Sequence, residues 1–237
     1  MRSLLALGIM CTLAACTDVK SSSIKTSGMS AHMHVTADGT GNTTATASLN
    51  VDDSAVDYID LSPGDTLTAS ASGQTQPMSR LDVLNAISYS ANFSGLDAEN
   101  TQYTIALTRM SDTSAPASTA TLPKPFRLTA PAAGQSFSRA GADIPVTWDA
   151  VGTDPMTYEI TGSSCVQTVI ATNIPGDSGS VTIPRSRLMP TAGSSTASCQ
   201  ITITIRRSRN GKLDSAYGYG GNIFAEQART VTVMSTP

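Results

Sequence analysis

The sequence predicts an all-β fold organised as two small β-sandwiches, and three observations support this prediction. Serine and threonine make up roughly a quarter of the chain, and threonine favours strands over helices. Most segments alternate apolar and polar residues, which is typical of strands buried on one face. Clusters of Gly, Pro and Asp interrupt these segments every eight to twelve residues or so, as they do in sandwiches. Together these features favour sheets over helix bundles.

The first fifteen residues have the pattern of an export signal peptide. Arg2 contributes a positive charge, an apolar stretch runs from Leu4 through Leu13, and two alanines follow. This order of charge, apolar run and small residues directs secretion. The run is too short to cross a bilayer, which takes about twenty apolar residues. We therefore expect residues 1–15 to be removed from the exported protein.

The residues around Cys16 indicate how the exported protein is held. The segment Leu13-Ala14-Ala15-Cys16 resembles the lipobox of bacterial lipoproteins. The resemblance implies that Cys16 becomes the first residue and carries a diacylglyceryl group and a further acyl chain such as palmitate. Stable anchoring takes two or more acyl chains, and this modification supplies them. An ordinary secretory peptide that contains a cysteine is the alternative.

In this family the residue after the lipidated cysteine influences sorting, and an aspartate there commonly retains the protein at the inner membrane. Thr17 occupies that position, and Asp18 follows it. The resemblance therefore implies the outer membrane, with the lipid bilayer as a partner through the acylated Cys16. The sequence leaves open whether the body faces the periplasm or the cell surface.

The four cysteines fit an oxidising compartment. Cys11 leaves with the leader and Cys16 carries lipid, so Cys165 and Cys199 remain as a pair. Disulfides form and persist outside the cytosol. A bridge that closes a loop of about 35 residues stabilises a fold by roughly 3–4 kcal/mol in the chain-entropy picture. We predict a Cys165–Cys199 disulfide, with two buried free thiols as the alternative.

Two polar stretches without periodicity divide the mature chain. Residues 16–30, which include three consecutive serines, are predicted to form the lipidated N-terminus and a flexible tether. Residues 111–125 are rich in Ser, Thr, Ala and Pro and are predicted to be a linker. These boundaries leave an all-β domain at 31–110 and a second sandwich at 126–237.

Period-two alternation predicts the strands of the first domain. One run covers residues 87–93 and another covers residues 103–107. Asp38-Gly39 lies between two such runs and predicts a hairpin turn. Only residues 79–86 could form a short helix. No known family is recognised in this domain.

In the second domain, Ile144, Val146 and Trp148 share one face of a predicted strand. Cys199 has the same parity as the isoleucines that follow it at alternate positions, so the cysteine is expected to face the core. Val231 and Val233 belong to the closing strand.

This domain also resembles the immunoglobulin-like or fibronectin-like modules of many envelope proteins. The resemblance covers residues 126–237 and rests on PAAG at 131–134, IPVTW at 144–148 and GSVTIP at 179–184. It implies an Ig-like sandwich that serves as a spacer or a binding module. In antibody domains the disulfide brackets the core tryptophan, whereas both cysteines here follow Trp148. That departure puts an antibody-type strand assignment in doubt.

The motif Gly176-Asp177-Ser178-Gly179-Ser180 resembles the nucleophile loop of trypsin-like serine proteases. A nucleophilic serine needs a histidine base within hydrogen-bond reach and an acid that orients this base. The two histidines of the chain belong to the other predicted domain. The motif also lies between two strand-like segments, where Gly and Asp form turns. We interpret it as a turn, and we predict no catalytic residue and no enzymatic activity.

His32 and His34 are weak candidates for a metal site. Alternation places both imidazoles on one face of a strand, and Met29 could add a thioether for copper. The apolar face of this strand belongs to Met33 and Val35, so we expect the histidines to face solvent. Two ligands alone make a weak site, and no metal or other cofactor is predicted.

An acidic cluster raises the question of calcium. It consists of Asp52, Asp53, Asp57, Asp60 and Asp65. Carboxylate-rich loops can supply the six to eight oxygens that calcium takes. The spacing differs from that of the twelve-residue calcium loop, and ordinary turn chemistry also explains these residues. The sequence leaves calcium binding open.

Tyr217 and Tyr219 form a candidate binding loop between the strand at 201–207 and the closing strand. Loops at the ends of a sandwich carry function on a rigid scaffold, and tyrosine offers a large amphipathic contact area. The alternative is a hairpin whose tyrosines cover the end of the sandwich.

The charge of the chain excludes one class of partner. The formal net charge is −3, and loss of Arg2 with the leader makes it −4. Nucleic-acid binding needs clustered Lys and Arg, and we interpret the single basic spot at 206–209 as a solvated strand end. We expect a non-catalytic outer-membrane lipoprotein that acts as an envelope binding or assembly module, with an envelope protein or glycan as partner. A tethered hydrolase with an unrecognised site and a purely structural spacer are the alternatives.

Overall fold

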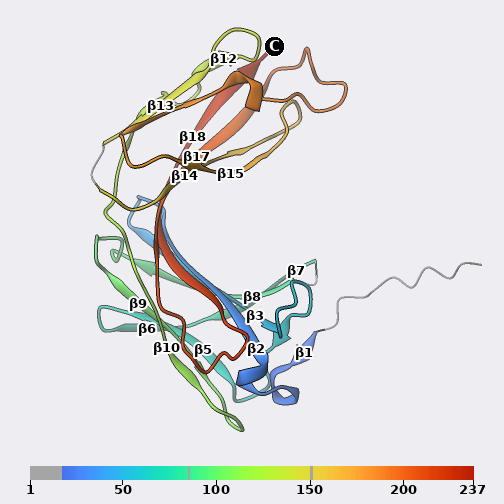
Figure 1. The fold of residues 1–237 in the computed structure, drawn as a ribbon, viewed down its shortest axis with the longest axis vertical. Helices are drawn as coiled ribbons and strands as arrows, with labels where there is room; N and C mark the ends of the chain where they lie inside the picture. The colour runs from blue at the N-terminus through green and yellow to red at the C-terminus, as the bar shows by residue number, and fades with distance from the viewer. Residues whose placement is uncertain (1–17, 85, 150–151) are drawn as a thin grey trace, which may run out of the picture.

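The computed structural model describes residues 18–237 except 85 and 150–151, and it contains two β-sandwich lobes (Figure 1). The lobes are stacked end to end and form a C-shaped molecule. The all-β, two-sandwich prediction is confirmed.

The strands divide between a lower lobe, an upper lobe and a shared pair. The lower lobe contains β1 (Val19–Lys20), β2 (Met29–Ala37), β3 (Asn42–Val51), β4 (Ile59–Asp60), β5 (Thr66–Ala71), β6 (Gln74–Pro77), β7 (Ser79–Val83), β8 (Ala86–Ser94), β9 (Gln102–Thr108) and β10 (Ala115–Thr121). The upper lobe contains β11 (Leu128–Ala130), β12 (Ser136–Ser138), β13 (Ile144–Trp148), β14 (Met156–Thr161), β15 (Val169–Ile174) and β16 (Ser180–Ile183). Both lobes share β17 (Cys199–Asn210) and β18 (Gly221–Thr236). The helical elements are short 3₁₀ turns at Ser21–Ser23, Thr26–Gly28 and Arg185–Arg187.

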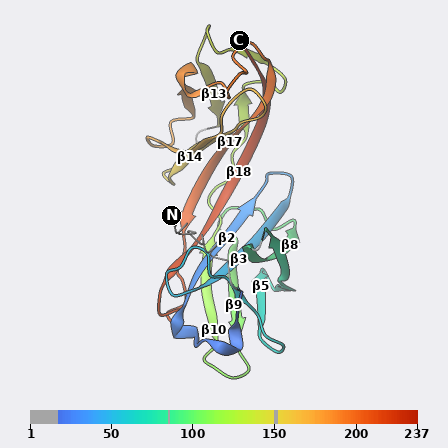
Figure 2. The ribbon, with the colours of Figure 1, turned by 90° about the vertical axis from the view of Figure 1, so that its right-hand side faces the viewer.

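One large sheet passes through both lobes, in the order β15-β14-β17-β18-β2-β3-β8-β7. β18 pairs with β17 from Ser235 to Phe224, and its first half also pairs in parallel with β2. Figure 2 shows β18 crossing from one lobe to the other without a break. In the lower lobe this sheet is completed by the sheet β10-β9-β5-β6, and in the upper lobe by β11-β13-β16.

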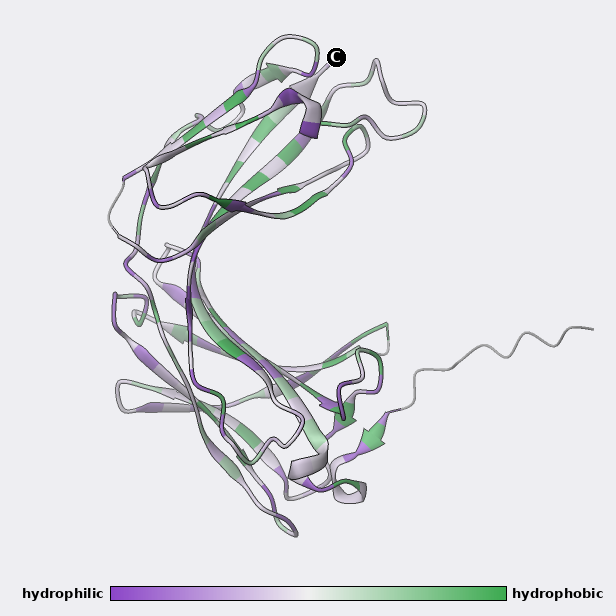
Figure 3. Ribbon diagram, viewed as in Figure 1, coloured by the Kyte–Doolittle hydropathy of each residue, from purple (hydrophilic) through white to green (hydrophobic). Residues whose placement is uncertain are grey.

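Each lobe has its own core, and the alternation along the strands builds it (Figure 3). The lower core contains many alanines on β2, β3 and β5, together with an edge-to-face pair of Phe93 and Tyr103. The upper core surrounds Trp148, the isoleucines of β17 and the disulfide. Because small and large side chains alternate across facing strands, both cores close without helices.

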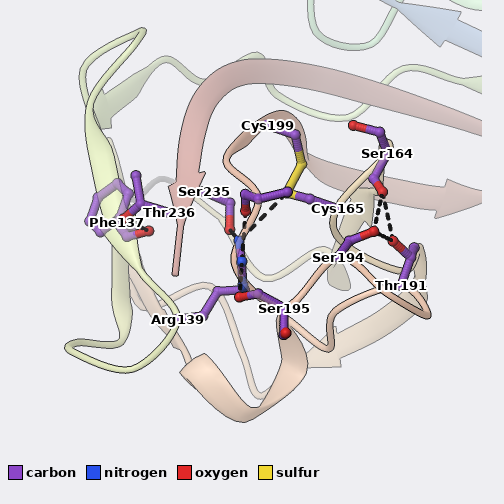
Figure 4. Close-up of a disulfide and its surroundings, with 11 residues drawn as sticks. Phe137, Arg139, Ser164, Cys165, Thr191, Ser194, Ser195, Cys199, Ser235 and Thr236 are labelled. Atoms are coloured by element: carbon purple, nitrogen blue, oxygen red, sulfur yellow. Dashed lines mark hydrogen bonds between the residues drawn. A yellow bond between two sulfur atoms is a disulfide. The ribbon is translucent and has the colours of Figure 1, made fainter.

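The predicted Cys165–Cys199 disulfide is confirmed, with Cα atoms 5.7 Å apart (Figure 4). Beside it the Arg139 guanidinium donates to the carbonyl oxygens of Ser195 and Ala197, at 3.0 and 2.8 Å. The bridge therefore ties the loop between β14 and β15 to the start of β17, and Arg139 holds the long connection between β16 and β17.

The structure differs from the expected linker at 111–125. Residues 115–121 form β10, which pairs with β9 and buries Ala115 and Ala120 in the lower core. The lower lobe also receives residues from the C-terminal part of the sequence, including Tyr217 and Ile223. The parallel pairing of β18 with β2 joins segments about 190 positions apart, so local sequence patterns carry no sign of it.

Two further expectations need correction. Residues 79–83, which could have formed a helix, form the edge strand β7 paired with β8. Residues 19–28 do not form a flexible tether, because β1 pairs with β4 and the side chains of Ser21 and Thr26 are fully buried.

Candidate functional site

The inner curve of the C-shaped molecule is lined by the solvent-facing side of the shared sheet (Figure 1). Alternation places short polar side chains on this side in both lobes. They are Thr44, Thr46 and Ser48 on β3, Ser88 and Ser90 on β8, Thr202 on β17, and Thr230 and Thr232 on β18. We call this surface the concave face.

A charged cluster lies on the concave face where the two lobes meet. The Glu226 side chain is only 2% exposed, and its Oε1 accepts a hydrogen bond from Arg206 at 3.1 Å. The same oxygen lies 3.1 Å from Nε2 of His34. Arg206 also donates to Glu159 of the upper lobe at 3.0 Å. The contacts of the cluster thus link β2, β18, β17 and β14.

The surroundings of Glu226 keep it ionised. Burial by itself raises the pKa of this carboxyl group. The His34 hydrogen bond and charge, the positive charge of Arg206 and the Thr36 hydroxyl outweigh burial and hold the pKa below its usual value. The His34 ring packs on Phe224 with ring centres 4.2 Å apart, which fixes its orientation.

The hydrogen bonds of His34 do not form a catalytic triad. The Thr36 hydroxyl and Glu226 both contact the same ring nitrogen, Nε2. A hydroxyl nucleophile is activated when the histidine uses one nitrogen for the hydroxyl and the other for the acid. The geometry at His34 therefore differs from that of a triad.

The structure does not bring the weak metal candidates together with further ligands. His32 is exposed beside His34 on the concave face and lies opposite Ser48. Among the residues described, no group of three or more His, Cys, Asp or Glu side chains is placed to hold a metal ion.

The protease-like motif has a structural role. The Asp177 carboxylate accepts hydrogen bonds from Trp148 Nε1 at 2.8 Å and from Arg207 at 2.6 Å. The Ser178 hydroxyl donates to the carbonyl oxygen of Ser180, as in a tight turn. The turn thus connects the core tryptophan to β17.

Arg207 contradicts the interpretation of residues 206–209 as a solvated strand end. Its side chain is completely buried and pairs with Asp177, whose side chain is also completely buried. Arg209 pairs with Asp154. Their parity on β17 is that of Cys199 and the buried isoleucines, so the strand continues to point these side chains inward at its end.

Within the acidic cluster, two aspartates are occupied by cations of the protein itself. Asp60 accepts from Lys20 at 2.6 Å and from Arg80 at 2.9 Å. The buried Asp65 accepts from Arg109 at 2.7 Å and from the Ser21 hydroxyl. These oxygens already have strong donors, so ion pairs account for them.

The two tyrosines of the candidate loop have different environments. Tyr217 is buried in the lower core, and burial raises the pKa of its hydroxyl. Tyr219 is 53% exposed. The intervening Gly218 lies against the Ser27 backbone, where a Cβ atom would approach the carbonyl oxygen to 2.2 Å. The loop therefore covers the lower lobe, and only Tyr219 is available to a partner.

The N-terminal segment is held by Arg109, which sequence reasoning missed. Its guanidinium is 1% exposed and donates to Asp65, to the Thr26 hydroxyl and to the carbonyl oxygens of Ser21 and Ile24. An arginine next to a predicted strand end gave the only sequence signal. The described chain thus begins on the body of the lower lobe.

No protein-family model matches this sequence, and no curated protein matches it either. Solved structures are similar only at a low level. A titin fragment is 11% identical, with a TM-score of 0.27 and coverage of 87% of this chain and 96% of that chain. The tandem Ig repeats of Dlar are 13% identical, with a TM-score of 0.33 and coverage of 84% and 98%.

A tri-modular GH5 endo-β-1,4-glucanase from Bacillus licheniformis, complexed with cellotetraose, is 12% identical with a TM-score of 0.28. The match covers 88% of this chain but only 39% of the glucanase. The class of the fold therefore rests on the sheets described above. Within the described part of the chain, no helix has the length and apolar character needed to span a membrane.

Proposed function

We propose that the protein is a lipoprotein of the outer membrane, anchored through acylated Cys16, that acts as a non-catalytic binding or assembly module of the cell envelope. The observation that carries the proposal is the attachment of the N-terminal segment to the body. Val19 pairs with Ile59, only three residues after Cys16. An acyl anchor at Cys16 would therefore hold the lower lobe directly at the bilayer.

The concave face is the surface proposed for the partner, an envelope protein or a glycan. Its rows of hydroxyl groups and the His34–Glu226–Arg206–Glu159 cluster offer donors and acceptors on a rigid sheet. The protease-like motif at residues 176–180 supports Trp148 through the Asp177 carboxylate. This structural use of the motif favours a binding role over a hydrolytic one.

The anchor is tested by the intact mass of the protein purified from native membranes. The expected mass is that of a chain beginning at Cys16 plus a diacylglyceryl group and an acyl chain. A Cys16→Ser variant should lose this mass and leave the membrane fraction, whereas Cys11→Ser, which changes only the leader, should keep both. Protease treatment of whole cells then separates surface from periplasmic exposure. An unmodified, soluble wild-type chain would refute the proposal.

A further inference from the structure

The side of the lower lobe that carries the start of the described chain also carries exposed apolar side chains. Val56, Leu81, Val83 and Leu84 are 54%, 46%, 65% and 96% exposed. They are half of the eight large hydrophobic residues that are exposed in the described part of the chain. Scattered exposed apolar residues are ordinary, but such a concentration marks an interaction surface.

Strand pairing and ion pairs bring the β7–β8 hairpin next to the N-terminal segment, with Arg80 on one face of β7 and Leu81 and Val83 on the other face, level with Ser88 and Ala86. β1 pairs with β4 through Lys20 and Asp60. Asp60 also accepts from Arg80 of β7, so Lys20 and Arg80 share one carboxylate. β7 is the last strand of the shared sheet, and it ends at the tip that carries Leu84 (Figure 1).

Val56 belongs to the same region. It lies in the loop that joins β3 to β4, the strand that pairs with β1. At the base of this loop the Val51 N–H donates to the Asp57 carbonyl oxygen, and the Asp52 N–H donates to the Gly28 carbonyl oxygen of the N-terminal segment. We call Leu81, Val83 and Leu84 of the hairpin the apolar patch, and Val56 is a further exposed apolar residue beside the N-terminal segment.

The backbone at Leu84 is unusual for a leucine. Its φ of 53° lies in the left-handed region. The other non-glycine residues with positive φ in the described part of the chain are Asp52, Ser72 and Asn100, which have short polar side chains. Asn or Gly would be favoured at such a hairpin tip in water, both for conformation and for exposure. An exposed leucine at this position is accounted for if a binding partner covers its side chain.

The short distance along the chain between Cys16 and Val19 limits how far the proposed lipid anchor can lie from β1. Val19 is three positions after Cys16, and an extended chain of that length spans at most about 11 Å. On the proposed function, the glyceryl group of an acylated Cys16 is therefore held within that reach of β1. The exposed Lys20 and the half-exposed Arg80, on the other face of β7 from Leu81 and Val83, suit the phosphates of the lipid headgroups.

We propose that the β7–β8 hairpin is a second membrane contact, in which Leu81, Val83 and Leu84, with Val56, enter the leaflet that holds the acyl chains of Cys16. This inference rests on the proposed function, since the anchor brings the patch to the bilayer. Two contacts at the edge of the lower lobe that ends in β7 fix the orientation of the lobe and set the angle between the concave face and the membrane.

The test uses the mature chain, with its disulfide closed and Cys16 coupled to a maleimide-bearing phospholipid. Leu84→Trp is tethered to vesicles of phosphatidylethanolamine and phosphatidylglycerol that contain lipids brominated on the acyl chains. Bromine should quench the emission of the introduced tryptophan, whereas Ile170→Trp, at a position that is also highly exposed, on edge strand β15 of the other lobe, should retain its emission. Equal emission changes in both variants would overturn the proposal.

A second measurement removes the anchor. The Cys16→Ser chain with Leu81→Ser, Val83→Ser and Leu84→Asn should bind the same vesicles about tenfold more weakly or worse, because each buried aliphatic side chain favours the apolar phase. The control pair Ile170→Ser and Met189→Ser should leave binding unchanged. Loss of a dimer on triple substitution, seen by sedimentation without vesicles, would instead assign the patch to a second copy and overturn the proposal.

The two proposals fail separately. Chemical coupling supplies the lipid whether or not the cell acylates Cys16, so an absent lipid mass refutes only the anchor. Absent quenching in the coupled protein refutes only the hairpin contact.

Discussion

Asp177 and Ser178 are neighbours in one sequence motif and differ in what they contact. Asp177 is buried between Trp148 and Arg207, whereas the Ser178 hydroxyl is exposed and bonds within its own turn. Removing one partner of a buried ion pair leaves an uncompensated charge and costs about 3–5 kcal/mol. Asp177→Ala should therefore lower the free energy of unfolding by this amount, as measured by urea denaturation monitored by Trp148 fluorescence. Ser178→Ala should change it by less than about 0.5 kcal/mol.

The same comparison gives the outcome that would contradict this assignment. Equal urea midpoints for the two variants would mean that Arg207 finds another partner when Asp177 is removed. A large loss on Ser178→Ala alone would mean that the turn depends on its hydroxyl.

At the level of single residues, the alternation along β17 predicted one more buried side chain than our interpretation of the sequence accepted. The alternation from Cys199 through Ile205 correctly placed these side chains in the core. The same alternation continues to Arg207, but its charge favoured a solvated position. Asp177 lies 30 residues away in sequence, so the partner that permits burial was visible only in the structure. Glu226 and Arg206 of the concave face were missed for the same reason.

Among the elements, the N-terminal segment 18–28 is held by the buried ion pair Asp65–Arg109 and by Asp112, which accepts a hydrogen bond from the Thr26 N–H. Asp65→Asn removes the buried charge that is paired with Arg109, so local opening of the segment should become easier by about 3 kcal/mol, or roughly a hundredfold. Trypsin cleavage after Lys20 and Lys25 reports this opening. Cleavage should accelerate in Asp65→Asn and remain at the wild-type rate in Asp53→Asn, a change at an exposed position in the same acidic cluster.

Acid should have the same effect on the wild-type chain. Burial raises the pKa of Asp65, but hydrogen bonds from Met110 and Ser21 and the charge and hydrogen bond of Arg109 outweigh it and hold the pKa below the usual value. A carboxyl group with a lowered pKa stabilises the folded state fully above its unfolded pKa of about 4 and loses this effect as the pH falls through the folded pKa. The amide protection factors of residues 19–28, which compare each exchange rate with the intrinsic rate at the same pH, should therefore decrease below about pH 4 in the wild type and change less in Asp65→Asn. Identical pH profiles would exclude Asp65 as the group responsible.

Element prediction succeeded where contacts are local and failed where they are distant. Alternation predicted β8, β9, β13 and β17 because each strand buries one face. It did not predict that residues 115–121 pair with β9 or that residues 19–20 pair with β4, since these short strands have weak alternation of their own. Their pairing is specified by the neighbouring strand.

For the whole molecule, the shared strands raise the question of whether the lobes unfold separately. β17 and β18 supply core residues to the upper lobe, and the first half of β18 supplies Ile223 and Ala225 to the lower one. At the junction Arg209 donates to Asp154 of the upper lobe and to the carbonyl oxygen of Leu122 of the lower lobe. If either lobe unfolded, β17 and β18 would lose strand pairing on one side, and the other lobe depends on these two strands.

We therefore expect both lobes to unfold in one cooperative transition. Ile203→Ala opens a cavity in the upper core and should lower the free energy of unfolding by about 2–5 kcal/mol. Trp148 fluorescence reports the upper lobe, and amide exchange of β2 and β3 reports the lower lobe. Both signals should shift together to lower denaturant concentration, whereas Thr230→Ala, at an exposed position of β18, should move neither by more than about 0.5 kcal/mol. Retained protection of β2 and β3 after Trp148 is exposed would contradict this expectation, because it would mean that the lower lobe and the first half of β18 are stable without the upper lobe.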